Sequence, residues 1–236
     1  MPVSAILDRL AAVGPYFALA HGTPPADSGL RPLTELYGEL LAPYVAEVAR
    51  RMGTRDLRVA ASTAHLGLAS RLCSLALGSA ALGGRVLDLP PDRLLWRHPP
   101  GESLQLWLPE TALRHEPPPR ALAATVLEAN LGVLDPALRA GYGLSPQILR
   151  GNAASALVGA LRVLMNRAPG APYPPGGTVG ELLGDDGPLA GTAALFVHDD
   201  ELGTAFVRRS CCLYYRAPGG GLCGDCVLRT RRSERV

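Results

Sequence analysis

The sequence contains no lysine, so all 23 of its Lys and Arg positions are arginines. With abundant Ala, Gly, Pro and Leu, this bias is typical of a GC-rich genome, and we infer no chemistry from it. Charged residues are also scarce, at 19% of the chain, and the net charge is only +2. This balance gives no reason to expect nucleic acid as a partner. A hydrophobic fraction of 47% in 236 residues predicts a sizeable core and excludes global disorder.

Long uncharged apolar runs are absent as well. The most apolar stretch, residues 59–82, is interrupted by His65 and Arg71, whereas a membrane span needs about 20 mostly apolar residues. The first residues carry Asp8 and Arg9 where a secretory signal would have its apolar run. We therefore expect no transmembrane segment and a cytoplasmic location.

Cysteine is scarce and unevenly distributed. There are 5 cysteines, and all but Cys73 lie between residues 211 and 226. The odd count, the clustering and a reducing compartment argue against a disulfide scaffold. Cys73 lies in an apolar helical stretch, where we expect a small buried core residue.

The spacing of apolar residues predicts an α+β fold: a mostly helical body with a small antiparallel sheet, followed by a C-terminal cysteine segment. A turn is expected at Asp135–Pro136. Helices are expected over residues 3–12, 34–52, 56–82, 120–133, 145–167, 179–184 and 187–197, and strands over 16–22, 86–89, 94–98 and 103–109.

Composition divides the chain into three regions. A stiff Glu-Pro-Pro-Pro spacer at 116–119 separates an N-terminal α+β region, residues 1–115, from a helical region, residues 116–205. The C-terminal region, residues 206–236, contains the clustered cysteines and is locally basic, with seven arginines from residue 208 onward. We expect it to be an appended module.

The four clustered cysteines have the spacing of a thiolate metal site. Cys211 and Cys212 are adjacent, and after ten residues Cys223 and Cys226 form a Cys-x-x-Cys pair. Converging thiolates bind an iron–sulfur cluster or zinc. Neighbouring side chains on a strand point to opposite faces, so the backbone at 211–212 must bend or the two sulfurs must reach different irons.

Spacing alone leaves three alternatives. A 2Fe–2S cluster fits four cysteines, and the loop between the pairs, with three glycines at 219–221, is able to fold back. A four-cysteine zinc site usually has two spaced pairs, and here only one pair is spaced. A redox dithiol is expected in a βαβ setting, which we do not find.

The residues Ser210–Arg216 (SCCLYYR) and Cys223–Cys226 (CGDC) resemble the C-terminal signature of the FhuF-type ferric-siderophore reductases. Two weaker stretches are also similar: residues 49–74, with Ala-Ala-Ser, resemble a helical region of that family, and residues 149–164 its Gly-Asn-x-x-Ser helix. Only the cysteine motif is specific. In the second helix we expect Asn152 and Ser155 to cap or bridge within the core.

The resemblance implies that Cys211, Cys212, Cys223 and Cys226 hold a 2Fe–2S cluster in residues 206–236. The implied function is that of a cytoplasmic ferric-siderophore reductase. It would transfer one electron to an Fe(III)–siderophore, of hydroxamate type in this family, and release Fe(II). A ferredoxin-like or flavin-dependent protein would donate the electron.

Three residues after the vicinal cysteines are candidates for contact with the substrate or the donor: Tyr214, Tyr215 and Arg216. We expect at least one of the tyrosines to pack in the core. The alternative function is a zinc-stapled, non-enzymatic protein that binds a siderophore or a partner. A relative from siderophore biosynthesis should lack the cysteine tail.

Overall fold

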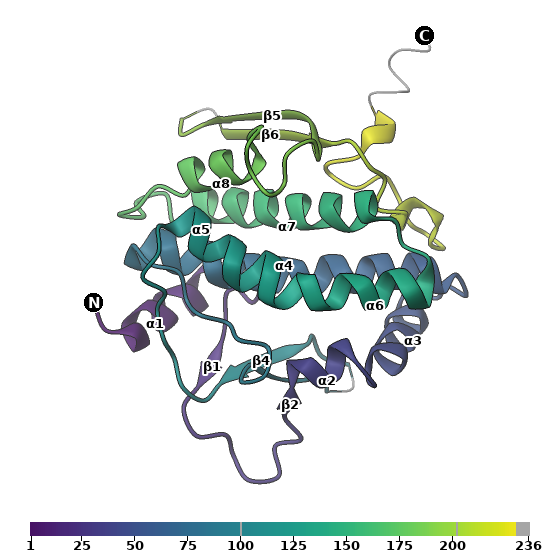
Figure 1. Ribbon diagram of the computed structural model, residues 1–236, viewed down its shortest axis with the longest axis horizontal. Helices are drawn as coiled ribbons and strands as arrows, with labels where there is room; N and C mark the ends of the chain where they lie inside the picture. The colour runs from purple at the N-terminus through teal and green to yellow at the C-terminus, as the bar shows by residue number, and fades with distance from the viewer. Residues whose placement is uncertain (100, 202, 230–236) are drawn as a thin grey trace.

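The computed structural model describes residues 1–99, 101–201 and 203–229 (Figure 1). The arginines at 231, 232 and 235, counted above in the basic tail, lie outside these ranges.

Two long helices, α4 (Leu57–Gly83) and α7 (Pro146–Arg167), pack against each other at the centre of the molecule (Figure 1). The Asp56 carboxylate caps α4 by accepting from two backbone N–H groups of the first turn, and Gly84 ends it with φ +76°. Ser145 caps α7 in the same way through its hydroxyl. Both helices begin within one residue of the start of the predicted ranges, 56–82 and 145–167. Both helices are apolar around most of their circumference, which is typical of buried helices.

Shorter helices surround this pair. The helical segment from 118 to 142 is longer than predicted and contains a π-helical stretch, so the expected turn at Asp135–Pro136 is wrong. Pro136 lies one turn after the π-helical stretch, where a change in hydrogen-bond pattern accommodates its missing N–H. The surrounding elements are α1 (Val3–Val13), α2 (Leu33–Tyr37), α3 (Leu41–Arg51), α5 (Pro118–Leu122), the π-helix η1 (Ala123–Leu131), α6 (Gly132–Tyr142) and α8 (Gly176–Leu183).

The predicted α+β class, with a mostly helical body, is confirmed. The strands form two sheets, and the first is mixed, where one small antiparallel sheet was expected. In the first sheet, of order β1-β4-β3-β2, the β1–β4 pair is parallel and the other pairs are antiparallel. The second is an antiparallel hairpin of β5 and β6, where a helix over 187–197 was expected. Pairing with β6 overrides the local helix propensity there. The strands are β1 (Ala20–His21), β2 (Arg31–Pro32), β3 (Leu95–Arg97), β4 (Gln105–Leu108), β5 (Ala193–Asp199) and β6 (Gly203–Arg208).

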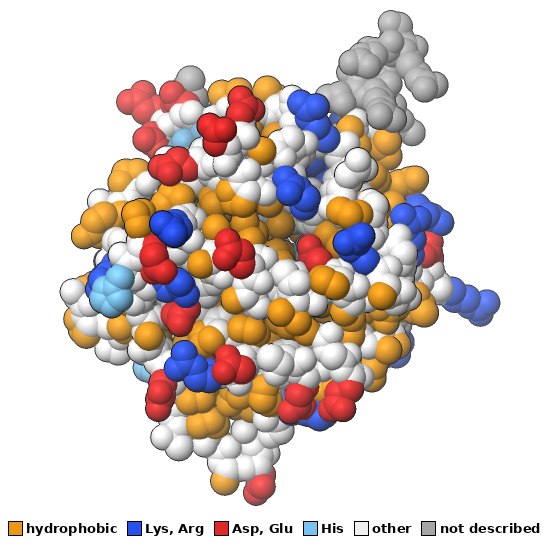
Figure 2. All heavy atoms as spheres, viewed as in Figure 1, with side chains coloured by type: hydrophobic (Ala, Val, Ile, Leu, Met, Phe, Trp, Pro, Cys, Tyr) orange, Lys and Arg blue, Asp and Glu red, His pale blue; other side chains and the backbone are white. Residues whose placement is uncertain are grey.

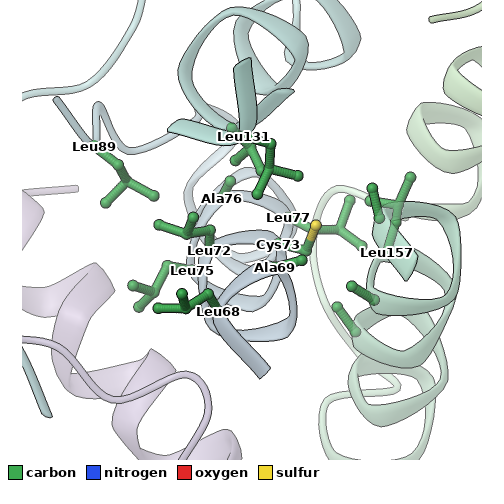
Figure 3. Packing of buried hydrophobic residues seen from close by; sticks show 14 of the residues in the cluster. Leu68, Ala69, Leu72, Cys73, Leu75, Ala76, Leu77, Leu89, Leu131 and Leu157 are labelled. Atoms are coloured by element: carbon green, nitrogen blue, oxygen red, sulfur yellow. The ribbon is translucent and has the colours of Figure 1, made fainter. Parts of the chain in front are cut away.

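One hydrophobic cluster extends from Ile6 of α1 to Phe206 of β6. Figure 3 shows Cys73 and Leu77 on the side of α4 that faces Leu157. Cys73 is fully buried as predicted, and burial raises its pKa to about 12. The cluster includes residues on both sides of the 115/116 boundary, and β6 spans the 205/206 boundary. The three-region division remains a prediction.

Three described stretches are long and apolar enough to cross a membrane, by length and composition only: Leu57–Gly83, Pro118–Tyr142 and Pro146–Arg167. The sequence was expected to contain no candidate membrane span, and by composition it contains three. In the first and third stretches, 78% and 72% of the apolar window is buried inside the fold, against 44% in the second. Packing between α4 and α7 accounts for the apolar character of these two helices.

Candidate metal centre

The cysteine segment, residues 209–229, follows β6 and lies against the N-terminal halves of α4 and α7 (Figure 1). None of its four cysteines is in a disulfide. Cys212 and Cys226 are buried, with 5% and 4% exposure, whereas Cys211 and Cys223 are half-buried. Two of the four predicted ligands are therefore buried, and the other two are partly open to solvent.

The sulfur atoms interact with one another. The Cys223 thiol donates a hydrogen bond to Cys212, which lowers the pKa of Cys212 to about 6 and raises the pKa of Cys223. Burial is the main cause that raises the pKa of Cys211. Cys211 and Cys226 also interact electrostatically. This crowding of sulfur donors is costly without a positive group between them.

The chain reverses its direction directly after the vicinal pair. Leu213 has φ +70°, in a left-handed region that costs a non-glycine residue about 1–2 kcal/mol. The conformation directs the Leu213 N–H to Cys211 Sγ, at 3.3 Å. The N–H groups of Tyr214 and Asp225 donate to Cys212 and Cys223. The predicted bend therefore exists, and it supplies N–H donors to sulfur, as iron–sulfur ligands require.

The Cys-x-x-Cys loop is anchored to α7 and β6. Arg162 Nη1 of α7 lies 2.6 Å from Asp225 Oδ1, and its Nε donates to the Thr204 carbonyl at 3.3 Å. The Arg208 N–H donates to the Asp225 carbonyl at 3.1 Å. Asp225 thus holds the loop from both its side chain and its backbone.

A buried polar network connects the cysteine segment to both central helices. Arg208 Nη2 donates to Asn152 Oδ1 at 2.9 Å. Asn152 Nδ2 donates to the Ser62 carbonyl and hydroxyl at 3.0 and 3.1 Å, and the Ser62 hydroxyl donates to the Cys212 carbonyl at 2.8 Å. The expectation that Asn152 bridges within the core is confirmed. Ser155 Oγ is buried and has no hydrogen-bond partner among the described residues.

Gly151 makes room for this network. A Cβ at this position would overlap the Ser210 hydroxyl and come within 2.8 Å of Arg208 Nη2. Gly151 therefore leaves space for the Arg208 guanidinium, and Asn152 accepts a hydrogen bond from it.

The three residues expected to contact the substrate or the donor lie on the surface. Tyr214 and Tyr215 are 42% and 47% exposed, so the expectation that one packs in the core is wrong. Both belong to the short helix η2 (Tyr214–Arg216), which projects their rings outward. Arg216 Nη2 lies 2.9 Å from Asp56 Oδ2, the N-cap of α4. Their contacts with other molecules remain predictions.

Comparison with known families identifies this arrangement. Residues 208–228 match the family model of the FhuF 2Fe-2S C-terminal domain. The segment is of the FhuF type. The match begins at Arg208 and includes all four cysteines, so the resemblance seen in the cysteine motif is confirmed; the weaker stretches at 49–74 and 149–164 lie outside it. No curated protein gives a significant match to the chain.

The cofactor of the FhuF-type domain is a 2Fe–2S cluster, and the donor set fits it. Among the described residues, no group of three or more His, Cys, Asp or Glu side chains is placed to hold a metal ion, but Cys212 and Cys223 form a close pair. A 2Fe–2S cluster binds its four cysteines as two pairs, one on each iron. The chain is an iron–sulfur protein, and the assignment of Cys211, Cys212, Cys223 and Cys226 as its ligands remains a prediction.

The residues that support the cysteines were not predicted from the sequence, above all Arg208, Ser62 and Arg162. Two signals in the sequence point to them. In β6, Phe206 and Arg208 alternate with outward residues, so both point inward on a period of two. Gly151 and Asn152, both poor helix formers in an Ala- and Leu-rich helix, were a second signal of a tertiary contact.

Proposed function

We propose that this protein is a ferric-siderophore reductase that works in the cytoplasm. It passes one electron to an Fe(III)–siderophore of hydroxamate type, and Fe(II) leaves the chelator. The FhuF-type cysteine segment carries this proposal. Its two half-buried cysteines support it, because an electron must reach an acceptor that stays outside the protein.

The chemistry requires little beyond electron transfer. Hydroxamate oxygens are hard, anionic ligands that hold Fe(III) tightly and Fe(II) far more weakly. When bound, the cofactor supplies the single electron that converts one ion into the other. The chain supplies the four sulfurs, donates N–H groups to three of them and leaves Cys211 and Cys223 partly exposed. No general acid, base or nucleophile is needed.

A ferredoxin-like or flavin-dependent protein is the proposed electron donor. Basic side chains lie on the side of the molecule where the cysteine segment is found, while acidic side chains gather near the turn of the β5–β6 hairpin (Figure 2). This asymmetry suits a donor with an acidic surface. The exposed rings of Tyr214 and Tyr215 offer apolar contact beside the cysteines.

Single-turnover kinetics test the proposal. Protein purified without oxygen is reduced stoichiometrically and mixed with a ferric trihydroxamate chelate. We expect the reduced-state EPR signal to disappear as one equivalent of Fe(II) appears on a ferrous-specific chelator. A cluster that stays reduced in the presence of excess chelate would contradict reductase activity.

Two cysteine variants provide the matched comparison. Cys212→Ser should lower cluster occupancy or change its spectrum, while the helical body still folds. Cys73→Ala removes a thiol that is fully buried in α4 and should retain spectrum and turnover. A colourless protein with one zinc ion would instead support the non-enzymatic alternative, a siderophore- or partner-binding protein.

A further inference from the structure

Arg208 is a buried cation in contact with the cysteine segment. It is 1% exposed and ends strand β6. Its Nη2 donates to the Ile148 carbonyl at 3.2 Å, to Asn152 Oδ1 at 2.9 Å and to Ser210 Oγ at 3.2 Å. All of these acceptors are neutral, and no carboxylate within the described ranges forms an ion pair with Arg208. A buried arginine without a carboxylate partner requires another source of negative charge.

The cysteines supply that charge. The ionisable groups that interact electrostatically with the guanidinium are Cys212, Cys223, Cys211 and Asp225, and the last of these is already paired with Arg162. Four thiolates around two ferric ions and two sulfides give a net negative centre, and reduction adds one more negative charge. A fixed cation nearby stabilises the reduced form more than the oxidised form.

We propose that Arg208 is the internal counter-cation of the 2Fe–2S centre and raises its reduction potential. Gly151, Asn152 and Ser62 are positioning residues that hold the guanidinium there. This inference rests on the cofactor and does not depend on the identity of the electron acceptor. It also gives a physical role to the Ala-Ala-Ser and Gly-Asn stretches of the two central helices, because Ser62 binds Asn152 and Asn152 binds Arg208.

Redox titration of the purified holoprotein, without siderophore, tests the role. Arg208→Met removes the charge, and Asn152→Asp neutralises it with an isosteric carboxylate. In both variants we expect the ratio of reduced to oxidised cluster at a fixed potential to fall at least tenfold, which is a shift of about 59 mV to lower potential. Arg208→Lys retains the charge and should shift the potential much less.

Two exposed positions serve as matched controls. Arg209→Met removes a neighbouring exposed arginine, and Asn166→Asp adds the same carboxylate to an exposed position of α7. Both should leave the potential near that of the wild type. The proposal is overturned if Arg208→Met and Asn152→Asp retain the cluster at wild-type potential, or if they shift it no more than the controls.

Loss of the cluster from both charge-changing variants would also count against tuning of the potential. In that case Arg208 would be needed for assembly of the site. Circular dichroism separates this outcome from global unfolding, because the helical body gives most of the signal.

A second buried arginine carries an independent inference. Arg71 of α4 is 7% exposed, and no carboxylate in the described part of the chain pairs with it. Its Nη1 donates to the Pro15 carbonyl at 2.6 Å, its guanidinium lies 5.6 Å from the centre of the Tyr16 ring, and its buried Nε has no partner. No cysteine of the iron–sulfur segment interacts with it.

Arg71 lines a cavity of about 190 Å³ between α3, α4 and the segment after β3. The cavity is lined by two arginines and several hydrogen-bond donors, and none of its described lining residues is acidic. Arg51 already pairs with Glu47 at 2.7 Å, which leaves Arg71 as the cation without a carboxylate. Its polar lining residues are Tyr16, Tyr44, Arg51, Arg71, His98 and Ser103.

We infer that this cavity binds a compact oxyanion, a phosphate or carboxylate group, with Arg71 as its main ligand. Buried cations are otherwise paired, and arginine forms two parallel hydrogen bonds to such groups. The volume admits one such group and is too small for a whole siderophore chelate. No residue of the cysteine segment lines the cavity, so the two sites are distinct.

Calorimetric titration with inorganic phosphate and, separately, acetate, at constant ionic strength, tests this site. We expect the wild type to bind at least one of the two, and Arg71→Gln to weaken binding at least tenfold. Arg167→Gln, which removes an exposed arginine of α7, should bind like the wild type.

Gly67→Leu offers a second route that keeps the arginine. A Cβ on Gly67 meets nothing within 4 Å, so the longer side chain fills the cavity. Wild-type protein that binds neither anion, or a Gly67→Leu variant that binds as well as the wild type, would overturn the assignment.

Discussion

Arg208 and Arg71 are both buried and both lack a carboxylate partner, yet their surroundings differ. Arg208 has three neutral acceptors from α7 and the cysteine segment, and thiolates supply the opposite charge. Arg71 has one backbone acceptor, an aromatic ring and a cavity. The first site is completed by the chain and its cofactor, and the second is left open to a ligand. A buried arginine without a carboxylate therefore indicates a binding site, and the groups around the guanidinium indicate which anion completes it.

The largest expected change in unfolding free energy is at Gly151, beside Arg208. Gly151→Ala places a methyl group against the Arg208 guanidinium and the Ser210 hydroxyl, which should destabilise the protein by about 2–3 kcal/mol. Gly159→Ala, in the same helix, meets nothing within 4 Å and should stabilise it by about 0.5–1 kcal/mol. Urea unfolding of both variants measures the difference. Equal effects would show that Arg208 is not tightly held.

Removal of the Asn152 side chain should have the next largest effect. Asn152→Ala leaves the Arg208 guanidinium without one of its two side-chain acceptors and Ser62 without a donor, at a cost of about 2 kcal/mol. Chemical denaturation of the holoprotein measures it. The same substitution at Asn166, which is exposed, is the control and should cost little. Arg71 has no such side-chain acceptor, so no equivalent substitution exists there.

A smaller effect is expected at the anchor of the Cys-x-x-Cys loop. Arg162→Met breaks the ion pair with Asp225, but the Arg162 side chain is 36% exposed, so solvent weakens the interaction. We expect a loss of about 1 kcal/mol or less, together with faster release of iron to a strong chelator. Iron release at the wild-type rate would mean that the backbone contact from Arg208 alone holds the loop.

The smallest effect concerns the surroundings of Arg71. Glu47 accepts hydrogen bonds from Arg50 and Arg51, which lower its pKa from 4.5 to about 2. A lowered carboxyl pKa stabilises the folded state above pH 4.5, and this contribution is lost as the pH falls toward 2. NMR titration of the Glu47 carboxyl measures the shift, and Glu47→Gln should flatten the acid limb of the stability curve slightly. A Glu47 that titrates near its ordinary value would show that Arg51 is free to turn toward an anion.

Several features of the fold follow from local sequence signals. Asp56, Ser145 and Gly84 mark helix ends because each satisfies backbone groups within one turn. The hairpin of β5 and β6 escaped prediction, because its strands are stabilised by each other and not by their own residues. Pro136 led to the wrong prediction of a turn, because the spacing of apolar residues gives no sign of the π-helical stretch before it.

In the candidate site, too, one part could be predicted from the sequence and another part could not. The spacing of Cys211, Cys212, Cys223 and Cys226 was enough to predict a thiolate centre, because metal ligation depends on residue type and chain separation. The contacts that hold the cysteine segment join residues far apart in the sequence: Ser62 bonds to Cys212, 150 positions away, and Asn152 to Arg208, 56 positions away. No local pattern connects residues at that separation.

The sequence by itself determined the cysteine motif, the FhuF-type segment and the two long apolar helices, since each depends on short-range spacing and residue chemistry. Only the tertiary structure decided that Arg208 is buried beside the cysteines, that Arg71 faces a cavity, and that Tyr214 and Tyr215 are exposed. Burial depends on which distant segments pack together, and the free energy of a charge depends on that burial.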